Sequence, residues 1–334
     1  MRQHDLSFAN FILRFGINEV LLDYVEEIVL PAFLNEDHIR RRGETELRFY
    51  NTQLRQLGTH EGVPVLGISG HFVKDTKLRR QQIFREGEGL VPLPAEIESA
   101  PSSFFVLILN NHRLLYFAET AGAPPLSSFG ATVEHFLRAE WHRYTREQVE
   151  YENVTRRGVE RLTLKQVQRR IPTPIVEVVR VAGQDAITDS ISRFGKITQL
   201  KLKLIQPNDE TDASEAISAV EESLRPLEPS RLEVVASQPK GLNRDEVERA
   251  VTDVAEGQNT HIVVDGEDKA GLKMQADNDE FALSIPVENP PADDAALTDT
   301  LFEKYQELAG EGKVKGLMSG AKISDAVRRL LGLL

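Results

Sequence analysis

Hydrophobic positions are most concentrated between Phe104 and Thr120, where two apolar runs flank a short polar break. The runs are Phe104–Leu109 and Leu114–Ala118, and Asn110 and Asn111 stand in the break. Two such runs predict a β-hairpin, because asparagine tolerates the left-handed backbone that a tight turn needs. Both runs are too apolar for an edge in water, so we expect this hairpin in the middle of a sheet.

The second half of the chain alternates between strand and helix patterns. In residues 196–206, leucines at 200, 202 and 204 alternate with lysines at 201 and 203, which is typical of a strand with one buried and one wet face. Further strands are expected at 176–181, 231–237, 260–266, 271–277 and 280–287, and helices at 184–194, 213–227 and 243–257. This order predicts an α/β sandwich, in which helices cover a mixed sheet.

The first half gives a less regular pattern, rich in strands and flanked by helices. Its expected elements are a helix over 17–34 that ends near Pro31, strands at 46–54 and 63–73, a charged segment at 74–89, a proline-rich connector at 90–102, and a helix from Ser127 or Ser128 to about Arg146. The two prolines of Ile171–Pro174 disfavour regular structure and mark the expected domain boundary.

The predicted fold class is therefore α+β, in three parts. Residues 1–170 form a β-rich N-terminal α+β domain with flanking helices, which includes a basic helical bridge at 138–170. Residues 171–290 form the α/β sandwich domain, and residues 291–334 form a C-terminal helical segment.

Composition and charge narrow the function classes. The chain has no run of ~18 apolar residues, which a membrane span needs, and no secretory signal is recognised, so a cytoplasmic protein is expected. It contains no cysteine, which excludes disulfides, thiolate metal sites and a cysteine nucleophile. Residues 1–180 hold 23 basic and 23 acidic residues, so the whole net charge of -12 lies in residues 181–334. This acidity argues against nucleic-acid binding by the second half.

The basic bridge carries the best indication of function. Residues 138–170 contain nine basic and five acidic residues, interleaved with Trp141, Tyr144 and Tyr151. Arginine and aromatic side chains together can hold phosphates and stack on bases. A second basic cluster at Arg79 and Arg80 could join the first in one groove. The predicted nucleic-acid ligands are Arg79, Arg80, Arg143, Arg146, Arg156, Arg157, Lys165, Arg169 and Arg170.

Two other interpretations of the bridge remain open. It could be a solvated helix face with internal ion pairs, or a surface that docks on the acidic half of the same or another chain. No catalytic motif is visible, and no cofactor or metal site is expected. His135 and His142, for example, lie seven residues apart on the expected helix, whereas metal ligands on a helix are commonly three or four apart.

Several of these segments resemble a bacterial family catalogued as DUF4747. The similarity covers roughly residues 104–287 and is carried by His112, Arg113, Leu114 and Phe117 on one strand and by the step Pro207–Asn208 after a later strand. The resemblance supports the fold more than a reaction, since the family has no established function. It implies a bacterial protein, and a phage-defence setting is plausible for such a family.

We therefore expect a nucleic-acid-binding component of a bacterial defence system, which contacts backbone phosphates without strong sequence preference. The alternatives are a protein-interaction subunit of a defence complex and a nuclease. The last expected helix, residues 321–334, has a wide apolar stripe. It could pack on its own domain, or it could bind a second copy or another protein.

Overall fold

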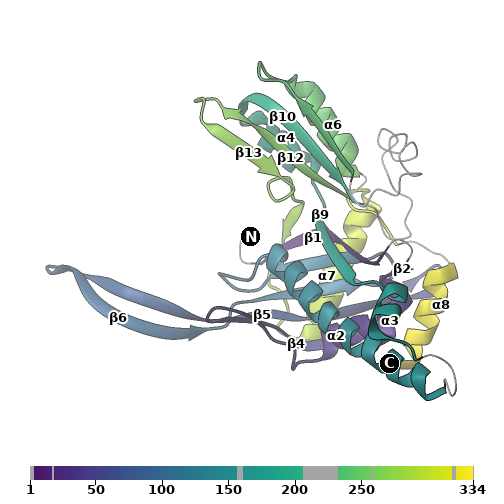
Figure 1. Cartoon of the computed structure of the whole chain (residues 1–334). Coiled ribbons are helices and arrows are strands. Elements are labelled where there is room, and N and C mark those ends of the chain that lie inside the picture. Colours follow the sequence, from purple (N-terminus) through teal and green to yellow (C-terminus); the bar gives the residue numbers. More distant parts are fainter. Residues whose placement is uncertain are drawn as a thin grey trace.

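The computed structural model describes residues 4–16, 19–155, 161–205, 232–256, 259–317 and 321–333 (Figure 1). They form a large body around a ten-stranded sheet and a second body around a four-stranded sheet. A two-stranded arm projects from the large body (Figure 1). The fold class is α+β, as the sequence predicts.

The large sheet has the order β14-β1-β8-β7-β5-β4-β3, and β2 and β9 also pair with β1 while β6 pairs with β5. All described pairings are antiparallel. The strands are β1 (Asp5–Phe15), β2 (Glu19–Val20), β3 (Arg40–Arg42), β4 (Thr45–His60), β5 (Val63–Arg85), β6 (Gly89–Ser99), β7 (Ser102–Ile108), β8 (Arg113–Ala118), β9 (Pro174–Arg180) and β14 (Ser284–Pro286).

The predicted hairpin is confirmed as β7 and β8, which lie in the middle of the large sheet. The left-handed residue of its turn is His112, with φ 54°, rather than an asparagine. The asparagine side chains instead link the turn to its neighbours: Asn110 Oδ1 accepts from the Leu66 N–H at 2.9 Å, and Asn111 Nδ2 donates to Tyr305 Oη at 2.7 Å. His112 is buried, as is the side chain of Arg113.

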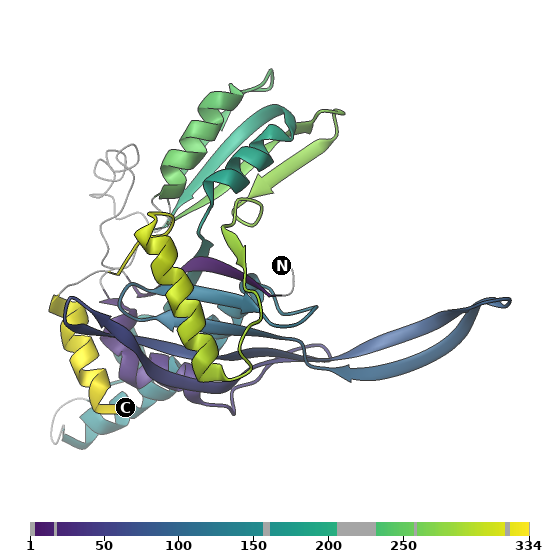
Figure 2. The same cartoon turned by 180° about the vertical axis from the view of Figure 1, so that it is seen from behind.

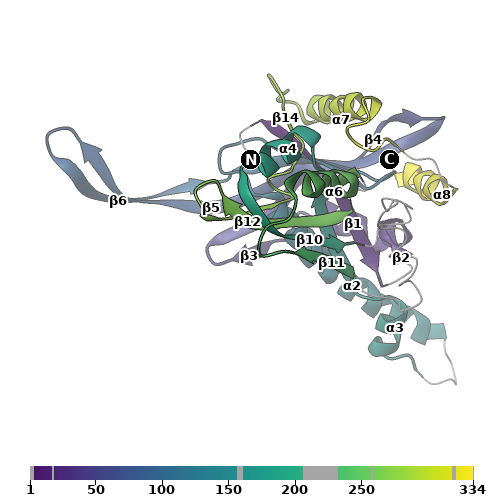
Figure 3. The same ribbon diagram turned by 90° about the horizontal axis from the view of Figure 1, so that it is seen from above.

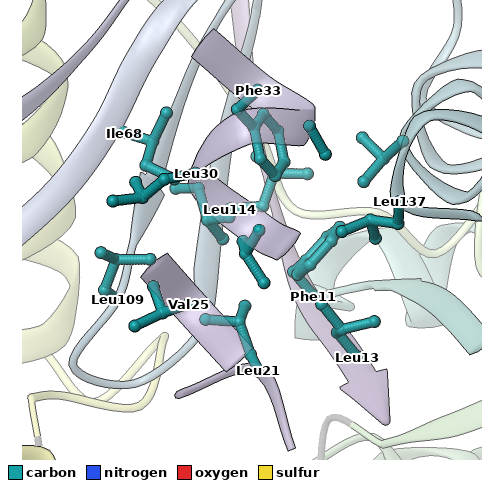
Figure 4. Close-up of a cluster of buried hydrophobic side chains, with 14 of the residues drawn as sticks. Phe11, Leu13, Leu21, Val25, Leu30, Phe33, Ile68, Leu109, Leu114 and Leu137 are labelled. Atoms are coloured by element: carbon teal, nitrogen blue, oxygen red, sulfur yellow. The ribbon is translucent and has the colours of Figure 1, made fainter. Parts of the chain in front are cut away.

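Helices and helical turns cover one face of the large sheet. They are a 3-10 turn (Leu21–Tyr24), a π-helical turn (Val25–Val29), α1 (Leu30–Leu34), α2 (Leu126–Thr155), and α8 (Ala321–Leu330), with α3 (Leu164–Arg170) packed on α2. Figure 4 shows Phe33 of α1 among the apolar side chains of this face. Its ring lies 5.2 Å from that of Phe49 and 5.8 Å from that of Phe105. Pro31 does not end the expected helix, because in the first turn of α1 its missing N–H is tolerated.

The opposite face of the sheet is covered by α7 (Asp294–Gly310), which lies behind the sheet in Figure 1 and in front of it in Figure 2. Leu297, Leu301 and Tyr305 of α7 pack against β1, β7 and β8. Because both faces are covered, all residues of β8 are buried, which explains why this strand reads as continuously apolar.

The second body consists of α4 (Gln184–Ser192), β10 (Phe194–Leu204), β11 (Leu232–Ser237), α6 (Arg244–Glu256), β12 (Thr260–Asp268) and β13 (Lys273–Asp277). Its sheet order is β11-β10-β12-β13. The alternation in β10 is confirmed, since Leu200, Leu202 and Leu204 face the core under α4 and α6. The pairings are antiparallel, whereas a mixed sheet was expected. The helix expected at 213–227 lies outside the described residues.

The connection between the bodies lies on one edge of β1. On that edge, residues 5–7 pair with β14 and residues 9–15 pair with β9, whereas β8 pairs with residues 6–10 on the other edge. The chain leaves the large sheet after Arg180 and returns at Ser284, and a bridge between Ala182 and Ala282 ties the two crossings together. The strand pairs thus place 174–180 and 284–286 in the large sheet. The boundary expected at Ile171–Pro174 therefore comes before β9, a strand that belongs to the large sheet. The sequence pattern of a strand does not show which of two sheets the strand joins.

The arm is formed by Thr76–Ser99, where β5 and β6 pair only with each other beyond the edge of the sheet (Figure 3). This region was expected to be a charged segment and a proline-rich connector. It is a hairpin instead, because prolines are tolerated on a strand with a neighbour on only one side. Pro92 pairs opposite Gln82 in such a position.

The C-terminal helix packs on its own body, the first of the two alternatives. Ala326, Val327 and Leu330 of α8 are buried in the core that also contains Leu21 and Val25. These residues of the apolar stripe that suggested a partner helix are therefore already covered by this chain, whereas Leu331 and Leu333, which follow α8, are exposed. Among the described residues, no helix combines the length and the apolar character that crossing a membrane requires.

Replacing Tyr305 by phenylalanine tests how α7 is fixed to the central hairpin. Tyr305 Oη accepts from Asn111 Nδ2 at 2.7 Å and donates to the Lys315 carbonyl at 2.9 Å in a buried site. Losing the hydroxyl leaves buried polar groups without this partner, so Tyr305→Phe should lower the free energy of unfolding by about 1–3 kcal/mol in urea titrations. The control Tyr151→Phe, at a residue with 71% exposure, should change it by less than about 0.5 kcal/mol. Equal effects of the two variants would contradict this role.

Candidate nucleic-acid interface

The nine basic residues predicted as nucleic-acid ligands fall in two separate regions. Arg79 and Arg80 lie on β5 in the arm, Arg143 and Arg146 on α2, and Lys165, Arg169 and Arg170 on α3. Arg156 and Arg157 lie outside the described residues. The arm and α3 lie on opposite sides of the large body in Figures 1 and 3, so the two groups do not form one groove.

The second region is a helical corner, formed by Trp141–Thr155 of α2 and Leu162–Ile171, which projects from the large body (Figure 3). Asn153 bonds both backbone groups of Leu162, at 2.8 Å to the N–H and 3.0 Å to the carbonyl. Thr163 and Gln166 form a capping box that begins α3. Trp141 Nε1 donates to the Ile171 carbonyl at 2.8 Å. These bonds hold α3 in a fixed position against α2.

Carboxylates of α2 neutralise part of the corner's positive charge. Arg143 Nε lies 2.5 Å from Glu140 Oε2, and its Nη1 lies 2.8 Å from Glu147. Arg170 Nη2 lies 2.6 Å from Glu152 Oε1. For Arg143 the structure therefore shows the intrahelical ion pairs that one of the alternative interpretations predicted.

Three cations of the corner remain open to solvent. Arg146, Lys165 and Arg169 are exposed and form no ion pair with any residue in the described part of the chain. Lys165 and Arg169 are four residues apart on α3 and so lie on one face of it. Among the three interleaved aromatic residues, only Tyr151 is exposed; Trp141 is buried, and Tyr144 packs on Tyr24 with 6.2 Å between ring centroids.

Arg143 has a structural task in the helical layer. Its Nη2 donates at 2.9 Å to the carbonyl of Glu27. The residue four positions later, Pro31, has no N–H that could donate to this carbonyl. Its partner Glu140 is buried, and His38 Nε2 lies 2.8 Å from the other carboxylate oxygen. The hydrogen bond to Glu140 is the main cause that raises the pKa of Arg143. We therefore assign Arg143 to the packing of α2.

The two arginines of the arm are also engaged within the chain. Arg79 Nη2 lies 2.7 Å from Glu44, and its Nε lies 3.2 Å from Glu96 on the neighbouring strand. Arg80 Nε donates to the Leu93 carbonyl at 3.2 Å. Since surface pairs of this kind are weak, they orient the arginines rather than bury them.

A second polar cluster, which we call the α7 clamp, was not predicted from the sequence. It consists of His71 on β5, Glu119 after β8 and Asp294 in the first turn of α7. His71 Nδ1 lies 3.0 Å from Glu119 and its Nε2 lies 3.1 Å from Asp294. Burial by itself lowers the pKa of His71, but the bonds to Glu119 and Asp294 outweigh it, so the pKa is raised. Because the three residues are far apart in the chain, no local spacing indicates the clamp.

A third cluster joins the second body to β9. Lys203 Nζ on β10 lies 2.8 Å from Glu177 Oε1 on β9, and His261 Nε2 on β12 lies 3.3 Å from Glu177 Oε2. The hydrogen bond from His261, together with Lys203, outweighs burial and lowers the pKa of Glu177 to about 2. The wet face of the second sheet is thus held to the large body by charge.

Within the described ranges, no group of three or more His, Asp or Glu side chains has the arrangement of a metal site. A shallow cleft between α4 and α6 is lined by Asp245, Glu248, Asp253 and Arg249, whose charges are mostly negative.

Comparisons with known proteins do not add a family. No protein-family model matches the chain, and no curated protein matches it significantly.

The α7 clamp predicts a pH-dependent contribution to stability. The pKa of His71 is raised above its ordinary value of 6.5, so its contribution is fully present below pH 6.5 and is lost as the pH rises through the raised value. His71→Gln should therefore lower the free energy of unfolding most, by about 2 kcal/mol, near pH 6, and progressively less toward pH 9. Urea titrations across this range test it, with His142→Gln as a control at an exposed histidine. A loss of equal size at every pH would rule out the charged clamp.

Arg143 and Arg146, three residues apart on α2, provide a matched pair for stability. Arg143→Ala removes a partner of the buried Glu140 and the donor to the Glu27 carbonyl, so it should cost about 2–3 kcal/mol. Arg146→Ala removes an exposed side chain and should cost less than about 0.5 kcal/mol. Thermal and urea unfolding measure both, and a larger loss for Arg146→Ala would show that the assignment of roles is wrong.

Proposed function

We propose that the protein binds nucleic acid through backbone phosphates at the helical corner, without strong sequence preference. The observation that carries the proposal is the presence of Arg146, Lys165 and Arg169, exposed and without ion pairs to described residues, on one rigid projection. Their charges are free to replace the counterions of a phosphate backbone, whereas those of Arg143 and Arg170 are engaged by glutamates.

The same geometry favours phosphates over bases as the contacted groups. Sequence-specific contacts need side chains that reach base edges, or aromatic platforms on which bases stack. In the described part of the corner, Tyr151 is the only exposed aromatic residue. A binding mode based on charge alone is insensitive to sequence and weakens steeply with salt. The bacterial defence setting rests on the family resemblance alone.

Because the chain as a whole carries a net charge of -12, it can bind a phosphate backbone only at a place where cations are concentrated. The whole of this net negative charge belongs to residues 181–334, beyond the corner in the chain. Salt at physiological concentration screens exposed charges over about 8 Å, so a projecting corner can bind phosphates while the rest of the molecule repels them.

Charge reversal at the corner tests the proposal. We expect the unmodified protein to bind labelled DNA or RNA oligonucleotides with micromolar affinity at 50 mM salt, with a log-linear loss of affinity as salt rises. The variant Arg146→Glu/Lys165→Glu/Arg169→Glu should bind on the order of 100-fold more weakly, and the salt slope should fall by about 3, one for each lost phosphate contact. Fluorescence polarisation over a salt series measures both quantities.

A control variant changes the net charge equally at another place. Lys240→Glu/Lys269→Glu/Lys273→Glu reverses three exposed lysines of the second body and should leave the affinity within about threefold. Equal losses in both variants, or no binding at 50 mM salt, would refute the proposal. If the corner variant changed the assembly state instead, the corner would be a protein-docking surface, as the alternative function holds. Mg²⁺-dependent cleavage of the oligonucleotide would favour the nuclease alternative.

A further inference from the structure

The arm exposes an unusual amount of apolar surface for a region whose contacts with the rest of the chain are confined to its base. Its five exposed large apolar residues are Leu78 (56%), Phe84 (75%), Leu90 (64%), Leu93 (37%) and Ile97 (54%). They are a third of the fifteen such residues in the described ranges, on a segment of 24 residues. Single exposed apolar residues are normal, but a concentration of this kind marks an interaction surface.

The pairing of the two strands places four of these side chains in two cross-strand pairs. Leu78 lies directly opposite Ile97 near the base of the arm, and Phe84 lies directly opposite Leu90 near its tip. No helix packs over the arm in Figures 1, 2 or 3. The side-chain bonds that join the arm to residues 44 and 45 lie at its base: Thr76 bonds to Thr45, and Arg79 bonds to Glu44. An isolated two-stranded hairpin is marginal in water, so a covered arm is the more stable state.

The edges of the arm are poor sites for the addition of another strand. Pro92 and Pro94 remove two N–H donors from β6. The outer edge of β5 beyond Asp75 has no neighbouring strand, but it carries Lys77, Arg79, Arg80 and Arg85, and charged side chains of this kind discourage edge pairing. A partner would therefore meet the apolar side chains on the surface of the ribbon rather than extend its sheet.

Charge indicates what kind of partner fits. The four basic residues of the arm are all on β5, and the four acidic residues, Glu86, Glu88, Glu96 and Glu98, are on β6 or at the tip. The arm is thus neutral as a whole, unlike a surface for nucleic acid or for an anionic membrane. A surface with both signs on separate strands can match a copy of itself, which is what a two-fold interface requires.

The arm has enough exposed apolar surface for such an interface. With the exposures above, the five side chains offer roughly 500 Å² per arm, since large side chains present about 150–250 Å² each when fully exposed. A single arm on another protein would bury roughly 1,000 Å² in total, the low end for a stable complex. Two arms packed on each other about a two-fold axis would bury the same roughly 1,000 Å², and each copy would supply the apolar surface that the other needs.

We propose that two copies of this chain form a two-fold dimer in which each arm (Thr76–Ser99) packs through its apolar side chains on the arm of the other copy. The proposal is independent of nucleic-acid binding at the helical corner, which lies on the other side of the large body. It also differs from assembly through α8, whose apolar face is covered within the chain.

Sedimentation velocity of the full chain, without nucleic acid and at 150 mM salt, tests the proposal. From about 0.1 to 50 μM, the unmodified protein should be dimeric at the upper concentrations. Phe84→Ser/Leu90→Ser should weaken self-association on the order of 100-fold, because apolar residues at the centre of an interface carry most of its binding energy. The control Gln81→Ser/Gln82→Ser changes two exposed polar residues of the same strand and should remain dimeric.

A shortened arm keeps the test decisive if the point variants merely disturb the hairpin. Replacing Arg79–Glu96 by Asn-Gly joins the paired residues Leu78 and Ile97 through a tight turn and leaves the large sheet intact. This variant should be folded by circular dichroism and monomeric. Because the chain has no cysteine, a spin label on Gln82→Cys should also report an intermolecular distance in the dimer.

Three results would overturn the proposal. The first is an unmodified protein that stays monomeric at 50 μM. The second is a dimer that persists in both Phe84→Ser/Leu90→Ser and the shortened variant. The third is a monomeric protein that loses nucleic-acid binding when the arm is shortened but keeps it in the helical-corner variant. In that case the arm would be the nucleic-acid contact.

Discussion

The architecture depends on how the two edges of β1 are shared. One edge pairs with β8 and so joins the hairpin that forms the centre of the large sheet. The other edge is divided between β14 and β9, the strands that lead out of and into the second body. Since a strand has only two edges, this division fixes where the second body is attached. The link of Lys203 and His261 to Glu177 then fixes its wet sheet face against β9.

Features set by local chemistry could be predicted from the sequence. The hairpin at Phe104–Thr120 follows from two apolar runs and a polar break, and the inward leucines of β10 follow from strict alternation. The start of α6 is similarly local: Asn243 Oδ1 accepts from the N–H of Asp245 at 3.0 Å and of Glu246 at 3.3 Å, as the side chain of an N-cap residue does. In each case, the residues that determine the structure are neighbours in the chain.

Features set by distant partners could not be predicted in this way. The arm was missed because charges and prolines are typical of loops, and only the pairing of Leu78 with Ile97 reveals a strand. The assignment of β9 to the large sheet depends on β1, about 165 residues earlier. For the candidate interface, composition located the basic corner, but it did not reveal which arginines are bound by carboxylates. Arg143 is engaged by the backbone of a helix more than a hundred residues away.

The second body is inserted between two strands that stand next to each other on the same edge. Its two crossings are already bridged at Ala182 and Ala282, so the large sheet would keep its strand order and its core if that insertion were longer, shorter or replaced by a tight turn. In terms of chain topology, the second body is an insertion in the large body. The part of the chain that carries the excess of acidic residues is therefore also the part whose length the large sheet constrains least.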